Sequence, residues 1–193
     1  MRVFLNPGHD TKYDSGAVHL DANGNVDLRE CDVALQIGEA VKRYFEAAGC
    51  ECCLMQSDNL APSIVGRSQY SDRQGLTVTE TANNWGADVF VSIHCNAFNG
   101  SARGTETECY SRMSNGGALA QCIQDQLVSS INTIDRGVRE RPDLLALQHT
   151  AMPAVLVEVA FIDNDADAAL LVNNWDDIAR AIARGVTDYQ CMQ

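Results

Sequence analysis

Three short apolar runs in this sequence each lead to a side chain that can bind a metal or carry a proton. The runs contain β-branched residues and read as buried strands. In open α/β sheets, ligands collect outside the carboxyl ends of the strands, so side chains placed there are site candidates. The candidates are His9, reached through Asn6-Pro7-Gly8 after residues 3–5, His94 after residues 89–93, and Glu158 directly after residues 155–157.

The residue types fit a catalytic zinc site, which takes three ligands from His, Asp, Glu or Cys and keeps one position open. His9 and His94 offer two imidazole nitrogens, and Glu30 is the candidate third ligand because it opens a predicted helix. A carboxylate in the first helical turn is also favoured by the helix dipole. Zinc polarises a carbonyl and lowers the pKa of water to about 7. One zinc ion per chain is the cofactor that this set predicts.

Glu158 is the candidate proton carrier for such a site. Partial desolvation at the end of a buried strand raises the pKa of a carboxyl group, and this suits it to act as a general acid and base. Each candidate has a plainer explanation when taken alone. A histidine after a strand is commonly structural, Glu30 suits any helix start, and Glu158 suits a paired buried acid. The convergence of four such residues on one sheet edge favours the catalytic interpretation.

The first half of the chain supplies the elements that position His9, Glu30 and His94. Residues 10–29 are polar and glycine-containing, which predicts a loop with a small hairpin turn at Asn23-Gly24. Apolar residues recur every three or four positions from Val33 to Ala48, and this spacing predicts a helix that ends at Gly49. The remaining predictions are strands at 2–5 and 51–56, a polar connection at 57–75, a helix at 77–85 and the strand before His94.

The second half continues the alternation of strands and helices. Its predicted elements are a strand within 100–110, a helix around 119–127, a short strand at Leu144–Leu147, the strand that ends at Glu158, and one long closing helix over 171–189. This alternation is typical of the α/β class. We therefore predict a single domain over residues 1–193, with a twisted, mixed, mostly parallel sheet and helices on both faces.

Composition excludes several classes of function. The chain has 193 residues, 14 of them basic and 26 acidic, and a net charge of −12. Binding to nucleic acid or an anionic membrane requires clustered Lys and Arg, so neither partner is expected. No run approaches the roughly 20 apolar residues of a membrane span. The N-terminus also lacks the apolar stretch of a signal peptide, so the sequence does not indicate an export route.

The eight cysteines do not follow a structural zinc pattern. Cys50 and Cys53 make one Cys-x-x-Cys, but no second copy exists to complete a four-cysteine site. We therefore expect free thiols that act as small buried apolar side chains.

An ordered set of short motifs resembles one known family, the zinc-dependent N-acetylmuramoyl-L-alanine amidases of type 3. Each fragment alone is weak, but their order along nearly the whole chain is specific. The fragments are Asn-Pro-Gly-His (6–9), Gly-Ala (16–17), Leu-Arg-Glu (28–30), Ala-Asn (82–83), Ala-Asp (87–88), Ser-Ile-His-Cys-Asn (92–96), Gly-Thr-Glu (104–106), Asp-Arg-Gly-Val (135–138) and Met-Pro-Ala-Val-Leu-Val-Glu (152–158).

The resemblance implies an activity and roles for individual residues. It implies zinc held by His9, Glu30 and His94, with Glu158 as the catalytic carboxylate. The implied reaction is hydrolysis of the amide between the lactyl group of N-acetylmuramic acid and L-alanine of the peptidoglycan stem peptide. Asn96 would lie beside the metal as a substrate contact or a support for the ligands, although a plain turn former suits it equally well. His149 is a further candidate for a substrate contact.

The resemblance also bears on the shape and setting of the site. Some members of the family carry an inserted helix that plugs the cleft, whereas residues 111–117 are too few for one, so we expect an open cleft. Peptidoglycan or its fragments would be the partner, and action would take place at the cell wall, outside the cytoplasm. Cell separation, sporulation, wall remodelling and phage lysis all use this chemistry. The sequence carries no indication of oligomeric state.

Three alternatives remain open at this level. A zinc peptidase that cuts within the stem peptide keeps the metal and changes the bond. A catalytically silent wall-binding module keeps the fold without turnover, and the intact Glu158 argues against it. A thiol or metal-storage protein is suggested only by the cysteines, and their spacing opposes it.

Overall fold

A computed structural model describes residues 1–62 and 75–193, and its centre is a six-stranded sheet. The strands lie in the order β4-β1-β5-β8-β6-β7. Four of them run parallel, and β6 and β7 run in the opposite direction. The predicted mixed, mostly parallel sheet is therefore confirmed. The bounds are β1 (Arg2–Pro7), β4 (Glu51–Leu54), β5 (Val89–Asn96), β6 (Thr105–Cys109), β7 (Asp135–Glu140) and β8 (Ala154–Phe161).

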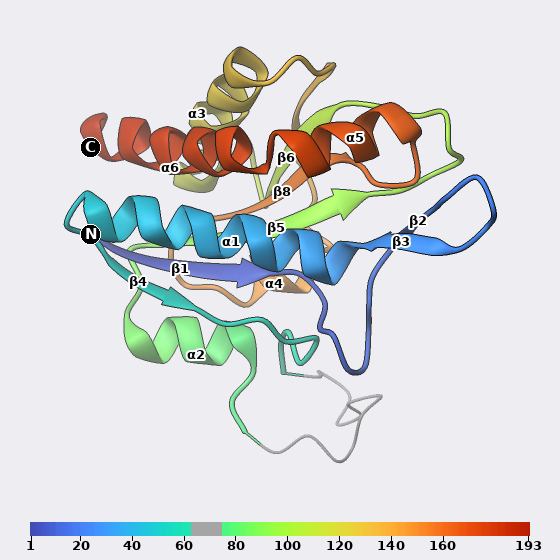
Figure 1. The fold of residues 1–193 in the computed structure, drawn as a ribbon. Helices are drawn as coiled ribbons and strands as arrows, with labels where there is room; N and C mark the ends of the chain where they lie inside the picture. Colours follow the sequence, from blue (N-terminus) through green and yellow to red (C-terminus); the bar gives the residue numbers. More distant parts are fainter. Residues whose placement is uncertain (63–74) are drawn as a thin grey trace.

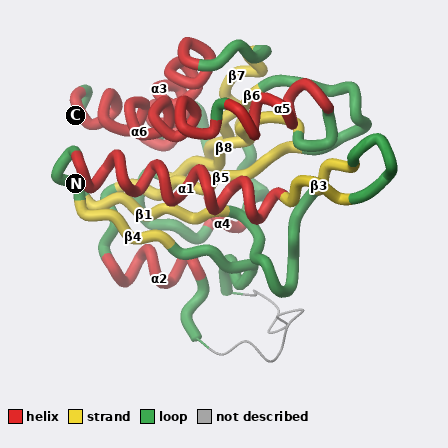
Figure 2. Tube along the Cα trace, viewed as in Figure 1, coloured by secondary structure: helices red, strands yellow, loops and turns green. Residues whose placement is uncertain are grey.

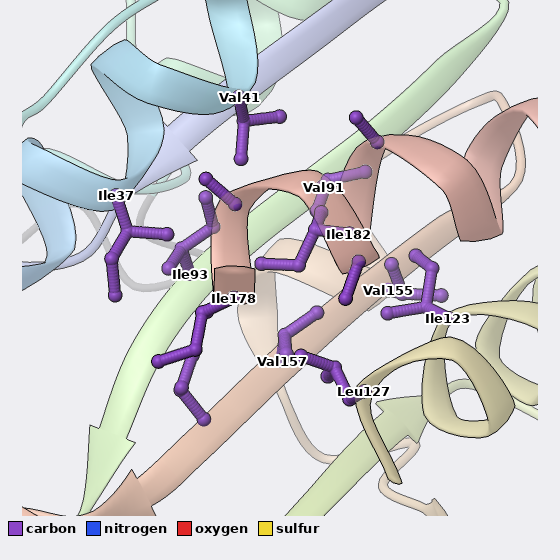
Figure 3. Close-up of a cluster of buried hydrophobic side chains, with 14 of the residues drawn as sticks. Ile37, Val41, Val91, Ile93, Ile123, Leu127, Val155, Val157, Ile178 and Ile182 are labelled. Carbon is purple, nitrogen blue, oxygen red and sulfur yellow. The ribbon is translucent and has the colours of Figure 1, made fainter. Parts of the chain in front are cut away.

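Three helices cover one face of the sheet and enclose the main core. They are α1 (Glu30–Ala47), α3 (Asn115–Ser130) and α6 (Trp175–Cys191). Alternate residues of β5 and β8 point toward these helices, since successive side chains of a strand face opposite sides. Figure 3 shows the resulting contact between Ile37 and Val41 of α1, Val91 and Ile93 of β5, Ile123 and Leu127 of α3, Val155 and Val157 of β8, and Ile178 and Ile182 of α6.

The other face carries a smaller apolar cluster under α2 (Val78–Trp85) and α4 (Leu145–Gln148). Figure 1 shows α1 and α2 on opposite sides of β1 and β4, so the prediction of helices on both faces is confirmed. Thr77 and Glu80 form a reciprocal capping box that starts α2, and Gly86 ends it in the left-handed conformation. Phe4 and Phe90 stack within this cluster.

A separate hairpin delivers the candidate ligand Glu30. Strands β2 (Val18–Leu20) and β3 (Val26–Arg29) pair antiparallel around a turn in which Gly24 has φ of 82°. This agrees with the hairpin predicted at Asn23-Gly24. Figure 2 shows the hairpin beyond the N-terminal end of α1, and Glu30 is the first residue of that helix. The carboxylate therefore sits at the junction between hairpin, helix and sheet.

The structure corrects four predictions. Leu144–Leu147 is not a strand, because the Leu144 carbonyl accepts bonds from Leu147 and Gln148 and starts α4. Strand β8 does not end at Glu158; it continues through three more buried apolar residues to Phe161. The closing helix is two helices, α5 (Asp165–Asn173) and α6, which meet at Asn174. Strand β7 was not predicted at all, because its sequence is mostly charged.

The remaining expectations follow the predicted pattern, with small shifts of boundaries. Most of the polar connection predicted at 57–75 lies outside the described residues. The eight cysteines are free thiols, as expected, but the expectation that they are buried holds for three of them, Cys31, Cys95 and Cys109. Among the described residues, no helix is both long and apolar enough to cross a bilayer.

Candidate metal centre and active site

His9, Glu30 and His94 come together at the carboxyl edge of the sheet. Each offers one ligand atom, and the three atoms lie within 4.8 Å of one another. His9 Nε2 lies 3.1 Å from Glu30 Oε2, and His94 Nδ1 lies 3.0 Å from Glu30 Oε1. The structure thus groups the three residues that the sequence proposed as ligands.

Glu30 is fixed from both sides by the backbone. The amide of Ala17, just before the hairpin, donates to Oε2 at 2.9 Å, and the amide of Cys95 on β5 donates to Oε1 at 3.0 Å. Its side chain is 5% exposed. Burial opposes ionisation of this carboxyl group, but hydrogen bonds from His9 and His94 outweigh burial and lower its pKa. A rigid, ionised carboxylate therefore lies between two imidazoles.

His9 is oriented by a residue that the sequence analysis missed. Asp14 Oδ2 lies 2.8 Å from His9 Nδ1, which leaves Nε2 on the side of Glu30. Burial lowers the pKa of His9, yet the hydrogen bonds to Glu30 and Asp14 outweigh it and raise the pKa to about 9. His9 also has a positive φ of 61°, a conformation that costs a non-glycine residue energy and often marks functional sites.

Two glycines let the ligands approach the backbone. A Cβ on Gly8 would lie 2.3 Å from the His94 ring. A Cβ on Gly16 would lie 2.5 Å from Glu30 Oε2 and 2.6 Å from His9 Cδ2, and Gly16 also has φ of 68°. Since a side chain at either position would displace a candidate ligand, these glycines are part of the site's geometry.

Glu158 lies on the strand beside His94. The two residues are register partners in the parallel pairing of β5 with β8. Oε2 of Glu158 is buried and has no hydrogen-bond partner among the described residues. Burial, and then the negative charges of Glu30, Glu108 and Glu106, raise the pKa of Glu158 well above that of an ordinary glutamate. Such a carboxyl group is suited to accept and return a proton.

Asn96 is bonded to Glu106, the register partner of Glu158, whereas His149 is bonded to Asn83. Asn96 ends β5 and donates from Nδ2 to Glu106 Oε1 at 2.8 Å. His149 follows α4, and its carbonyl accepts from Asn83 Nδ2 at 2.8 Å. No hydrogen bond or ion pair within the described chain joins His149 to His9, Glu30 or His94, so its role as a substrate contact stays a prediction.

The connection that could have held a plugging helix is short. Strand β6 ends at Cys109 and α3 begins at Asn115, with Ser114 as its N-cap. This agrees with the expectation that no helix is inserted between them.

Comparison with known proteins adds an independent line of evidence. The sequence profile of the family described as N-acetylmuramoyl-L-alanine amidase matches residues 3–188. The chain belongs to this family. The recognition made from the sequence motifs is therefore confirmed, and so is the interpretation of the chain as an amidase of that family.

Two curated relatives and one solved structure illustrate the match. The chain is 37% identical over 191 residues to the uncharacterized protein YqiI of Bacillus subtilis, covering 97% of this chain and 84% of YqiI. It is 34% identical over 192 residues to N-acetylmuramoyl-L-alanine amidase LytC of B. subtilis, covering 97% of this chain but 35% of LytC. The structure of amidase AmiC2 from Nostoc punctiforme superposes with a TM-score of 0.80 at 30% identity, covering 99% of this chain and 97% of that one.

Proposed function

We propose that this chain is a zinc-dependent N-acetylmuramoyl-L-alanine amidase, which hydrolyses the amide between N-acetylmuramic acid and L-alanine of the stem peptide. The observation that supports this best is the grouping of His9, Glu30 and His94 within 4.8 Å, beside Glu158, whose Oε2 is buried. Peptidoglycan or a fragment of it is then the substrate. The same proposal places the reaction at the cell wall, outside the cytoplasm.

The residues fit a single zinc ion. Two imidazoles and one carboxylate are an established ligand set for catalytic zinc, which leaves a further position open. Asp14 on the far nitrogen of His9 matches the carboxylate–histidine arrangement that commonly orients zinc ligands. When bound, zinc would supply Lewis acidity, polarising the scissile carbonyl and lowering the pKa of water toward 7.

Glu158 is proposed to move the proton. With its pKa raised by burial, it can take a proton from the attacking water. As the carbon–nitrogen bond breaks, the same carboxyl group returns the proton to the nitrogen of L-alanine. The products are then a free lactyl carboxylate and a peptide with a free amino terminus.

Mass spectrometry of soluble muropeptides incubated with the purified chain tests this proposal. Zinc content is measured beside activity for the unaltered chain, Glu158→Gln and His94→Ala. We expect peptides that begin with L-alanine only from the unaltered chain. Glu158→Gln should keep its zinc and lose turnover, whereas His94→Ala should lose both.

Other outcomes distinguish the alternatives. Cleavage within the stem peptide would replace the proposed bond and favour a zinc peptidase. Retention of peptidoglycan without any cleavage, at full zinc occupancy, would favour a wall-binding module. Full activity after complete removal of zinc would refute the metal-dependent mechanism.

A further inference from the structure

Strand β7 places two arginines on one face of the sheet edge by means of a bulge. Residues three apart in a regular strand face opposite sides. Here the register between β6 and β7 shifts between Thr105 and Thr107, and Gly137 takes a positive φ of 77°. Such a glycine bulge inserts one extra residue and changes the side of the sheet that the following side chains face. As a result, Arg136 and Arg139 both reach Glu106, at Nε to Oε2 distances of 3.0 and 3.6 Å.

Glu106 is the acid that pairs with the two arginines within the described residues. One oxygen of Glu106 pairs with both guanidinium groups, and its other oxygen is bonded to Asn96. The neighbouring acids have their own partners: Asp135 bonds Gln124 and the Gly137 amide, Glu140 bonds Ser111 and the Arg112 amide, and Glu108 bonds Arg141. In the part of the chain that the structure describes, these contacts leave the terminal nitrogens of both arginines available, and a guanidinium with free donors is a candidate site for an anionic ligand.

The guanidinium groups also have donors to spare. Arg136 uses Nε for Glu106, and its side chain, 33% exposed, lies over the Phe161 ring at 4.9 Å. Arg139 is 54% exposed and makes only the longer ion pair. Neither arginine has a hydrogen bond from its terminal nitrogens within the described residues. A guanidinium held in this way presents two N–H donors to one carboxylate.

The pair lies next to the candidate catalytic residue. Glu106 on β6 is the antiparallel register partner of Glu158 on β8. Residues directly opposite in such a pair have side chains on the same face, with Cβ atoms about 5 Å apart. The charge of Glu106 also contributes to the raised pKa of Glu158. A substrate whose scissile amide lies at Glu158 would therefore reach the two arginines with a neighbouring part of its peptide.

We propose that Arg136 and Arg139 form a subsite for a carboxylate group of the stem peptide, and so favour substrates whose peptide carries free carboxylates. The proposal rests on the amidase function above and adds a determinant of its specificity. Arg141, on the same edge, provides a natural contrast. Each of its three guanidinium nitrogens is already bonded, with two bonds to Asp143 and one to Glu108.

The test compares two probes, N-acetylmuramoyl-L-alanyl-D-glutamate with both carboxylates free, and the same compound with both as carboxamides. We expect the unaltered zinc-loaded chain to prefer the free acid by about tenfold in kcat/KM, mainly through KM. In the double variant Arg136→Gln/Arg139→Gln the preference should fall to within about twofold. Arg141→Gln serves as the matched control and should keep the preference.

The outcomes separate this inference from the function on which it rests. Equal rates for both probes, or an undiminished preference in the double variant, would overturn the carboxylate subsite while leaving the amidase function intact. If neither probe is cleaved, the proposed function fails, and NMR titration with L-alanyl-D-glutamate decides the inference. Shifts that are lost in the double variant but kept in Arg141→Gln support the subsite, and identical shifts in all three proteins refute it.

Discussion

Glu158 and Glu106 face each other across neighbouring strands, yet their surroundings are opposite. Glu106 is bonded to Asn96 and paired with Arg136 and Arg139. One oxygen of Glu158 is buried and unpartnered among the described residues, and burial together with the charges of Glu30, Glu108 and Glu106 raises its pKa. Two glutamates on one sheet face and in register are thus suited to different chemical roles.

The difference shows that partners, and not position alone, decide what a buried carboxyl group does. Desolvation disfavours the charged form unless cations or hydrogen bonds compensate for it. Glu106 has such compensation and can hold other groups in place. Glu158 lacks it, so its raised pKa suits proton transfer.

The largest expected effect is the difference in kcat between a variant of Glu158 and the same variant of Glu106. Glu158→Gln should lower kcat by about 10²–10⁴-fold, the usual contribution of a general base, because the amide cannot take a proton. Glu106→Gln keeps the proton carrier and should lower kcat by about tenfold at most, with a larger change in KM. Steady-state kinetics at matched zinc content checks this. Equal losses in both variants would mean that the two carboxyl groups act as one unit.

A second prediction concerns the candidate zinc ligands Glu30 and His9, whose charges act on Glu158. Gly16→Ala places a Cβ against Glu30 and His9, so zinc affinity should fall by about 10–100-fold, and activity with it. Gly24→Ala is the matched control, since Gly24 has a similar positive φ of 82° but open space around it. It should cost about 1 kcal/mol of folding free energy and leave zinc affinity unchanged. Competition with a chelating dye measures the affinity, and equal affinities in the two variants would contradict the packing argument.

The raised pKa of Glu158 predicts a pH-dependent stability in metal-free protein. A carboxyl group whose folded-state pKa exceeds its unfolded value destabilises the fold once it ionises in the unfolded chain. The cost is absent below about pH 4.5 and grows as pH rises toward the folded-state pKa. Glu158→Gln removes this cost, so it should be more stable than the unaltered chain at pH 7.

Urea unfolding of both metal-free proteins at pH 4.5 and pH 7 measures this difference. The advantage of Glu158→Gln should be small at the lower pH and grow at the higher one. A difference that does not change with pH would show that Glu158 titrates normally.

The sequence predicted His9, Glu30, His94 and Glu158 because each lies at the end or the start of a recognisable element. Apolar runs mark strands, and parallel strands bring the residues at their carboxyl ends to one edge of the sheet. This prediction does not require knowing which residues pair across neighbouring strands. It nevertheless misplaced the end of β8, since the valine and alanine after Glu158 continue the apolar pattern.

The sequence could not predict the group around Glu106, because that group depends on register and on a bulge. Strand β7 is mostly charged and lacks the alternation that marks a strand. Only the shift at Gly137 aligns Arg136 with Arg139. Asp14 was missed for a similar reason, since a loop aspartate gives no sign in the sequence that it will bond His9.

The smallest predicted effect concerns the link between Asn96 and Glu106. Asn96→Ala removes one hydrogen bond and should cost about 1 kcal/mol of folding free energy, the usual net value of such a bond. Asn96→Asp removes the same donor and also sets a negative charge against Glu106, so it should cost more than alanine does. Thermal unfolding of the two variants at pH 7 measures the order. If the aspartate variant is as stable as the alanine variant, Asn96 does not hold Glu106, and the arginines alone distinguish that carboxylate from Glu158.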